Sequence, residues 1–169
     1  HIHYDTQTNR LCFLIDAPCE LNTIWDHYHI AKHMRHQLFQ TGCVLLNDQI
    51  MRWNHTCHKQ DIVTILPLIE ESTIPPWKKE LRIVYEDACF LIVEKESGML
   101  VHSDGINHTH TLHNCVQAYY QDNHIQAIPR SVHRLDRDTS GLVLYCKMAF
   151  FQAYVDHLLA EKQIERIYL

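Results

Sequence analysis

The side chains best suited to acid–base or nucleophilic chemistry gather in residues 133–141, whose sequence is HRLDRDTSG. Two carboxylates, Asp136 and Asp138, stand there beside two guanidinium groups, and such groups are rarely buried unless they are paired. The closing Thr-Ser-Gly is typical of a turn. Residues 142–146 form an apolar run of strand length. The sequence therefore predicts a polar loop that brings two acids to one end of a buried strand, where scaffolds tend to carry working residues.

The charge pattern around Asp136 favours one kind of chemistry. Arg134 and Arg137 flank it in the sequence, and a guanidinium group close to a carboxylate favours the ionised form. An ionised carboxylate suits a nucleophile or a base and does not suit a general acid. An ordinary surface loop with solvated ion pairs explains the same residues equally well, because such networks also occur where nothing is catalysed.

The loop resembles the signature of a known family. Protein kinases are excluded because Leu135 separates the arginine from the aspartate and no Gly-rich phosphate loop precedes it. The sequence is similar to the HRLDxxTSGL signature of the RluA-type pseudouridine synthases, which isomerise uridine within RNA. The resemblance implies that Asp136 is the catalytic aspartate and that Arg134 contacts RNA. It places Arg137 and His133 among the RNA-binding residues. Arg137 is also a candidate for shaping the loop, and His133 is a candidate either for a general base or for packing the loop.

Two further positions carry the same resemblance. The family opens with a strand that ends in Asn-Lys-Pro-x-Gly. Lys95 and Gly98 match it, whereas Glu94 and Glu96 replace the asparagine and the proline. We expect Lys95 to position RNA or the loop, with a plain surface lysine as the alternative, and residues 99–102 to continue as a hairpin-like strand. Near the end, Tyr168 matches an active-site tyrosine that stacks on the target base, within a strand that begins at Ile164.

Residues 1–72 are expected to form a separate small module. Apolar spacing predicts helices over 21–30 and 31–39, with Gly42 as the helix stop, and strands over 9–15, 43–46, 50–53 and 61–66. This order resembles the α-L RNA-binding module named for a ribosomal small-subunit protein. The resemblance implies that Lys32 and Arg35 on the second helix face RNA, although a solvated helix surface explains either residue as well.

A Pro-Pro pair in residues 73–80 predicts an extended linker between this module and residues 81–169. We expect an α+β fold: a small α-L module followed by the N-terminal part of a pseudouridine synthase domain with a mixed, mainly antiparallel sheet. Because the family's catalytic domain continues further, we also expect a truncated chain with little activity of its own. Its missing initiator methionine suggests a trimmed or processed start.

Composition narrows the remaining possibilities. Seven widely spaced cysteines without a Cys-x-x-Cys pair predict reduced thiols in a cytoplasmic protein. No apolar run is long enough for a membrane helix. Fifteen histidines invite a metal hypothesis, but none follows a zinc spacing, so we expect neither metal nor cofactor. The net charge of −5 excludes little, because a basic face can coexist with it. We expect a monomeric enzyme acting on ribosomal or transfer RNA. Its rivals are a non-catalytic RNA-binding protein and, more remotely, a metal-dependent hydrolase.

Overall fold

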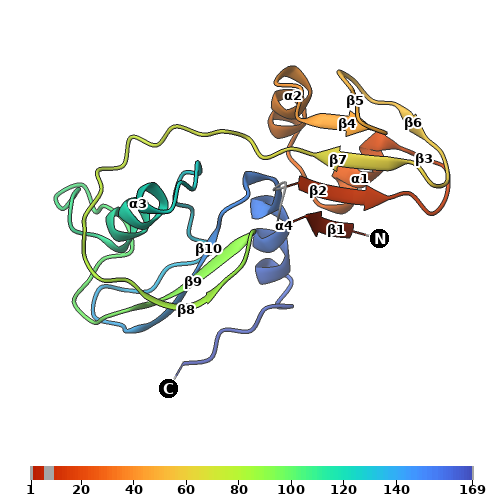
Figure 1. The fold of residues 1–169 in the computed structure, drawn as a ribbon. Helices are drawn as coiled ribbons and strands as arrows, with labels where there is room; N and C mark the ends of the chain where they lie inside the picture. Colours follow the sequence, from red (N-terminus) through yellow and green to blue (C-terminus); the bar gives the residue numbers. More distant parts are fainter. Residues whose placement is uncertain (1, 6–9, 169) are drawn as a thin grey trace. The chain divides into compact units, whose positions relative to one another are not determined.

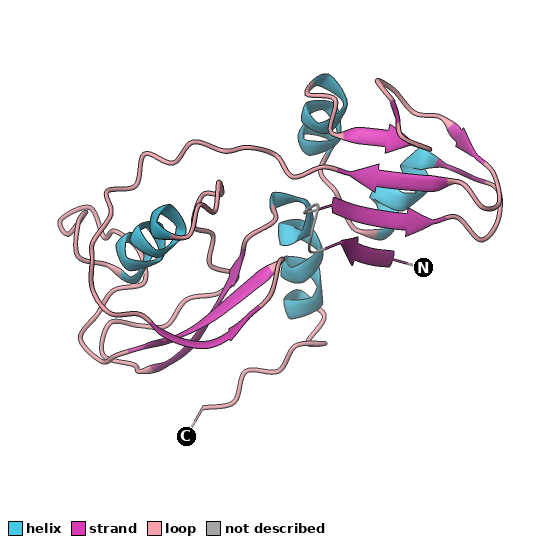
Figure 2. Ribbon diagram, in the orientation of Figure 1, coloured by secondary structure: helices cyan, strands magenta, loops and turns pink. Residues whose placement is uncertain are grey.

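The computed structural model describes residues 2–5 and 10–168 of the chain. They fall into two compact units, His1–Leu68 together with Ala153–Leu169, and Ile69–Gln152. Each unit combines helices with small sheets, and every strand pairing in the described part is antiparallel. The predicted α+β class is confirmed, as the ribbon in Figures 1 and 2 shows.

The first unit is built on a five-stranded sheet with the order β1-β2-β7-β4-β5. Its buried side chains include Leu11, Phe13 and Val63, and the two helices bury Trp25 and Phe39, whose rings contact each other edge to face. The elements are β1 (Ile2–Asp5), β2 (Arg10–Leu14), β4 (Val44–Leu46), β5 (Gln49–Ile50) and β7 (Ile62–Ile65), the two-stranded pair β3 (Cys19–Glu20) and β6 (Thr56–Cys57), and the helices α1 (Leu21–His27) and α2 (Lys32–Gln40).

Most of the predicted elements of this unit form, with shorter ends. Helix α1 stops at His27, three residues early, because His29 adopts a left-handed backbone with φ of 54°. Gly42 ends the α2 region with φ of 73°, as expected of a glycine stop. Strand β1 and the β3–β6 pair were not predicted, since two- to four-residue strands carry too little periodicity to detect.

The second unit packs α3 (Leu112–Asp122) on a three-stranded sheet with the order β10-β9-β8. The strands are β8 (Arg82–Glu86), β9 (Phe90–Lys95) and β10 (Gly141–Cys146). Burial alternates strictly along β9, so that Leu91, Val93 and Lys95 face the core. The core also holds buried residues of α3, β10 and the intervening loops: Met99, Val101, Leu112, Cys115, Val116, Tyr120, Leu135, Val143 and Tyr145.

Residues 99–102 do not form the predicted hairpin strand. The carbonyls of Leu100 and Val101 accept hydrogen bonds from the backbone N–H groups of Leu112 and His113, at 2.8 and 2.9 Å. These N–H groups belong to the first turn of α3, and the N–H groups of a first turn find no acceptor inside their own helix. The segment therefore caps a helix, and its polar backbone groups are satisfied without a sheet.

The segment predicted as a linker, residues 73–80, is irregular and is attached to α3. Asn114 is the centre of this attachment, at 2% exposure. Its Nδ2 donates to the carbonyls of Pro75 (2.7 Å) and His108 (3.1 Å), and its Oδ1 accepts from the backbone N–H of Thr111. The N–H of Trp77 in turn donates to the Asn114 carbonyl at 2.9 Å. One buried amide thus joins three segments.

Helix α4 (Ala149–Ala160) follows β10, and the boundary between the two units falls inside it. The strand predicted from Ile164 is not formed. Residues 165–168 are irregular, and no strand of the described part pairs with them, so their backbone has no ladder to join. Leu169, the last residue of that predicted strand, lies outside the described residues.

Replacing Asn114 by Ala should lower the free energy of unfolding by about 2–3 kcal/mol, because it leaves buried carbonyl and hydroxyl groups without partners. Urea denaturation followed by circular dichroism measures the change. Asn123→Ala is the matched control, since its Nδ2 makes one exposed hydrogen bond to the Tyr119 carbonyl. An equal loss in both variants would contradict the central role of Asn114.

Candidate active site

The loop of residues 131–140 is fastened to the strand that follows it. The N–H of Val132 donates to the Leu144 carbonyl at 2.8 Å, and the N–H of Leu144 donates to Nε2 of His133 at 3.2 Å. Leu135 enters the core, and the Asp136 carbonyl accepts the N–H of Thr139 at 3.1 Å in a tight turn. His133 therefore packs the loop, which was one of its predicted roles.

Asp136 stands exposed at the start of that turn. Within residues 2–5 and 10–168, its carboxylate makes no hydrogen bond or ion pair, so the expected pairing with Arg134 or Arg137 is not formed. The Arg137 Nε instead donates to the Gly98 carbonyl at 3.3 Å, and Arg134 is exposed. The carboxylate and the Arg134 guanidinium are therefore both accessible to a ligand.

Lys95 holds this loop from beneath. Its side chain is fully buried, and its Nζ donates to three backbone carbonyls, those of Glu96 (3.0 Å), Met99 (2.7 Å) and Arg137 (2.9 Å). An ammonium group has three donors, so all of them are used. Lys95 consequently positions the loop, and its full burial contradicts the alternative of a plain surface lysine.

The charge state of Lys95 reflects two opposing effects. Burial lowers the pKa of its ammonium group, because the charged form loses its hydration. The carboxylates of Asp138, Glu96 and Asp136 raise the pKa and partly offset that loss. Three of the acids around the loop thus help to keep the buried ammonium protonated.

The turn after β9 completes the attachment. The Gly98 N–H donates to the Arg137 carbonyl at 2.9 Å, and the Ser97 hydroxyl donates to the Asp138 carbonyl at 2.8 Å. Gly98 has φ of 86°, a left-handed conformation that favours glycine. Four hydrogen bonds therefore connect the turn with the loop of Asp136, and the other two bonds of Lys95 lie within the turn itself.

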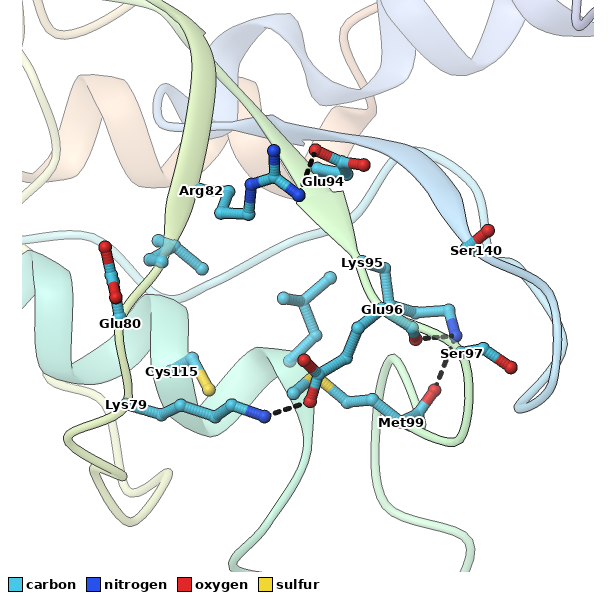
Figure 3. A pocket seen from close by; sticks show the side chains of 12 residues that line it. Lys79, Glu80, Arg82, Glu94, Lys95, Glu96, Ser97, Met99, Cys115 and Ser140 are labelled. Atoms are coloured by element: carbon cyan, nitrogen blue, oxygen red, sulfur yellow. Dashed lines mark hydrogen bonds and ion pairs between the residues drawn. The ribbon is translucent and has the colours of Figure 1, made fainter.

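A cavity of about 280 Å³ opens beside this turn, as Figure 3 shows. Lys95, Glu96, Ser97 and Ser140 lie on its wall, and Lys79 forms an ion pair with Glu96 at its rim. Asp136 does not line the cavity. The exposed carboxylate and this hollow are thus two distinct features of the second unit.

Comparison with known proteins identifies the domain that carries this loop. The model of the RNA pseudouridylate synthase family matches residues 89–169. This part of the chain belongs to the RNA pseudouridylate synthase family. The resemblance seen in the loop sequence is confirmed by the match.

Named relatives agree. The chain is 35% identical over 126 residues to the uncharacterized RNA pseudouridine synthase YhcT of Bacillus subtilis, which covers 74% of this chain and 42% of the relative. It is 34% identical over 131 residues to the ribosomal large subunit pseudouridine synthase D of Neisseria meningitidis serogroup B, covering 75% of the chain and 34% of the relative. With the same-named protein of Xanthomonas campestris the identity is 30%, over 77% and 40%. The chain thus spans well under half of the length of these relatives.

A polar contact joins α3 to β10 through His113 and Tyr145. The Tyr145 hydroxyl lies 2.8 Å from Nδ1 of His113, and Tyr145 is fully buried. Burial lowers the pKa of the His113 imidazole from 6.5 to about 4, and the nearby His102 lowers it in the same direction. His113 is therefore neutral at physiological pH and forms part of the support of β10.

The other predicted site residues belong to the first unit. Lys32 is exposed at the start of α2. Arg35 is already engaged, because its Nε donates to the Ile30 carbonyl at 2.7 Å and its guanidinium forms a 2.7 Å ion pair with Asp26. Tyr168 is 61% exposed in the irregular end. The second unit contains five of the predicted site residues: Lys95, His133, Arg134, Asp136 and Arg137. The other three, Lys32, Arg35 and Tyr168, belong to the first unit.

Other kinds of site were also considered. In the described part of the chain no group of three His, Cys, Asp or Glu side chains could hold a metal ion. All seven cysteines are free thiols. No helix among the described residues is long and apolar enough to cross a membrane.

Ser97 and the buried environment of Lys95 were missed at the level of sequence. A usable signal was present, because residues 91, 93 and 95 share one side of a strand in which 91 and 93 are apolar. That spacing placed a lysine at a core position, where its ammonium group had to find backbone acceptors.

Lys95→Met should lower the free energy of unfolding by about 3 kcal/mol, since three buried carbonyls lose their donor. Hydrogen exchange at the Gly98 and Thr139 amides should also accelerate, because the turn and the loop separate. Lys79→Met is the control, because Lys79 pairs with Glu96 of the same turn. Its half-exposed ion pair with Glu96 contributes less than about 1 kcal/mol. Unchanged exchange in Lys95→Met would contradict the proposed attachment.

His113 should make the synthase unit acid-sensitive. The unfolded chain binds a proton on His113 near pH 6.5, whereas the folded chain does so only near pH 4. The free energy of unfolding should therefore fall as the pH is lowered through this window, by up to roughly 3 kcal/mol. Urea denaturation at about pH 7 and about pH 4.5 should show a smaller difference in His113→Phe than in the parent. The exposed His36→Gln should keep the parental difference.

Proposed function

We propose that this protein is an RNA pseudouridine synthase that isomerises uridine in structured RNA. Two of the relatives are named as acting on the large ribosomal subunit, which favours ribosomal over transfer RNA as the substrate. The observation that carries the proposal is the exposed Asp136 carboxylate, presented on a loop that a buried lysine fixes from beneath. A group that must react with a bulky polymer has to be both accessible and held in place.

The proposed reaction needs no external oxidant or reductant. The bond between N1 of uracil and the anomeric carbon of ribose breaks, the base turns, and carbon 5 of the base bonds to the same sugar carbon. Carbon 5 loses a proton and N1 gains one, so atoms and electrons balance. The Asp136 carboxylate serves such a reaction either by attacking the anomeric carbon or by removing a proton from the neighbouring sugar carbon.

The surrounding residues have supporting roles in this proposal. Arg134, exposed beside Asp136, contacts a phosphate of the RNA once the target base has left the stack. Arg137 shapes the loop through the Gly98 carbonyl. Tyr168 offers an aromatic ring on which the displaced base stacks. The first unit, as an α-L-type module over residues 1–72, adds RNA affinity through Lys32.

A non-catalytic RNA-binding protein is the competing function. Such a protein would use the same fold. It is favoured by the lack of an ion pair at Asp136, because no cation of the described part contacts that carboxylate. Turnover separates the two possibilities, because a binding protein has no use for the Asp136 carboxylate.

In the complete gene product, Asp136→Asn should abolish pseudouridine formation while RNA affinity changes less than about threefold, because the amide is isosteric but neither a nucleophile nor a base. Release of tritium from carbon 5 of labelled uridine in ribosomal RNA measures the isomerisation. Asp138→Asn, one turn residue further along, is the matched control and should retain at least about a tenth of the activity. Full activity of Asp136→Asn would refute the proposal.

A further inference from the structure

Trp53 is the most exposed tryptophan of the chain, at 71%, and lies between β5 and β6. Trp25 is fully buried and Trp77 packs against the core of the second unit. In the described part of the chain, the Trp53 indole makes no hydrogen bond and no ring contact. A single exposed apolar side chain needs no explanation by itself. The surroundings of Trp53 make it unusual.

The backbone on each side of Trp53 is anchored to a helix. The Arg52 guanidinium donates to the last carbonyls of α2, those of Phe39 (3.2 Å) and Gln40 (2.8 Å). On the other side, Asn54 donates through Nδ2 to the Glu20 carboxylate (2.8 Å) and accepts through Oδ1 the N–H of Asn22 (2.9 Å), at the start of α1. The segment that carries the indole is thus held in place, so a ligand that binds the ring need not bear the entropy of ordering a loop.

Helix α2, which was predicted to present basic residues to RNA, offers few free cations. Arg35, one of two basic residues predicted to face RNA on α2, is paired with Asp26. Lys32, His33 and His36 remain exposed on that helix, which is about 13 Å long. The chain as a whole carries a net charge of −5. Phosphate contacts and counterion release alone would therefore give weak RNA binding.

We infer that Trp53 is a stacking platform for an unpaired base of the RNA substrate. The inference rests on the proposed function and extends it, because it assigns the first unit a preference for single-stranded nucleotides. Stacking is tolerant of base identity and independent of charge, so it supplies the affinity that the few free cations do not. Arg52 fixes the platform to the C-terminal end of α2. Lys32, exposed at the opposite end of this helix, contacts the backbone of the same RNA.

A protein partner fits this surface less well. Binding hot spots of proteins lie within patches that exclude water, and the two residues that adjoin Trp53 in sequence, Arg52 and Asn54, are polar. Proteins that bind single strands combine aromatic rings on which bases stack with cations that contact the backbone, and Trp53 and Lys32 are exposed groups of these two kinds in the first unit.

The test measures the affinity of the complete protein for a uridine-rich single-stranded RNA and for a blunt RNA duplex of equal length, over a series of salt concentrations. Trp53→Ala should weaken single-strand binding roughly 5- to 150-fold. The slope of log affinity against log salt should stay the same, because no cation is lost. Trp53→Phe should recover most of the affinity. Lys32→Ala should instead reduce the slope, and Ile106→Ala, 90% exposed in the other unit, should change neither quantity.

Single-strand affinity within twofold of the parent in Trp53→Ala, or an equal loss on the duplex, would overturn the inference. The Asp136-dependent isomerisation is scored separately. If the parent protein shows no turnover and Trp53→Ala loses single-strand binding, the enzyme is refuted and the stacking platform is retained. Normal turnover together with unchanged binding would refute the platform alone.

Discussion

A buried ammonium group at the end of β9 is the constraint on which the candidate active site depends. The strict alternation of β9 gives Lys95 a core position, where an unpaired charge would be very costly. The cost is met by three backbone carbonyls from two separate segments of the chain. Because the third carbonyl belongs to Arg137, satisfying the buried charge also fixes the loop that carries Asp136. The burial of Lys95 therefore holds the loop on which Asp136 is exposed.

This arrangement also explains how the chain departs from its family pattern without losing the turn. Glu96 stands where the family has a proline, so the backbone there lacks a fixed φ. Other contacts restrain it: the Glu96 carboxylate pairs with Lys79, Ser97 bonds to the loop, and Gly98 takes the left-handed conformation. The acidic substitution further favours protonation of Lys95. Local ion pairing and hydrogen bonds thus replace the stiffness of a pyrrolidine ring.

The two units expose different chemical groups. Around Asp136 the accessible groups are a carboxylate and a guanidinium on a restrained loop, suited to a displaced nucleotide and its phosphate. In the first unit, Arg35 is paired with Asp26, and the exposed groups include Lys32, Lys59, several histidines and the Trp53 indole. A small unit with few free cations gains affinity for RNA more readily from stacking than from charge.

The sequence by itself determined the contiguous features. The acid loop and its strand, the α+β class, the two helices of residues 21–39 and the glycine stop at Gly42 follow from local periodicity and turn chemistry, which depend on neighbouring residues alone. The pairing expected between Asp136 and its flanking arginines did not follow, because adjacent residues in an irregular loop point in different directions. Only the tertiary structure decided that Lys95 bonds to Arg137, that Asn114 gathers three segments, and that Arg35 is taken by Asp26. Each of these depends on long-range or cross-turn packing, which brings together polar groups whose partners no spacing along the chain can specify.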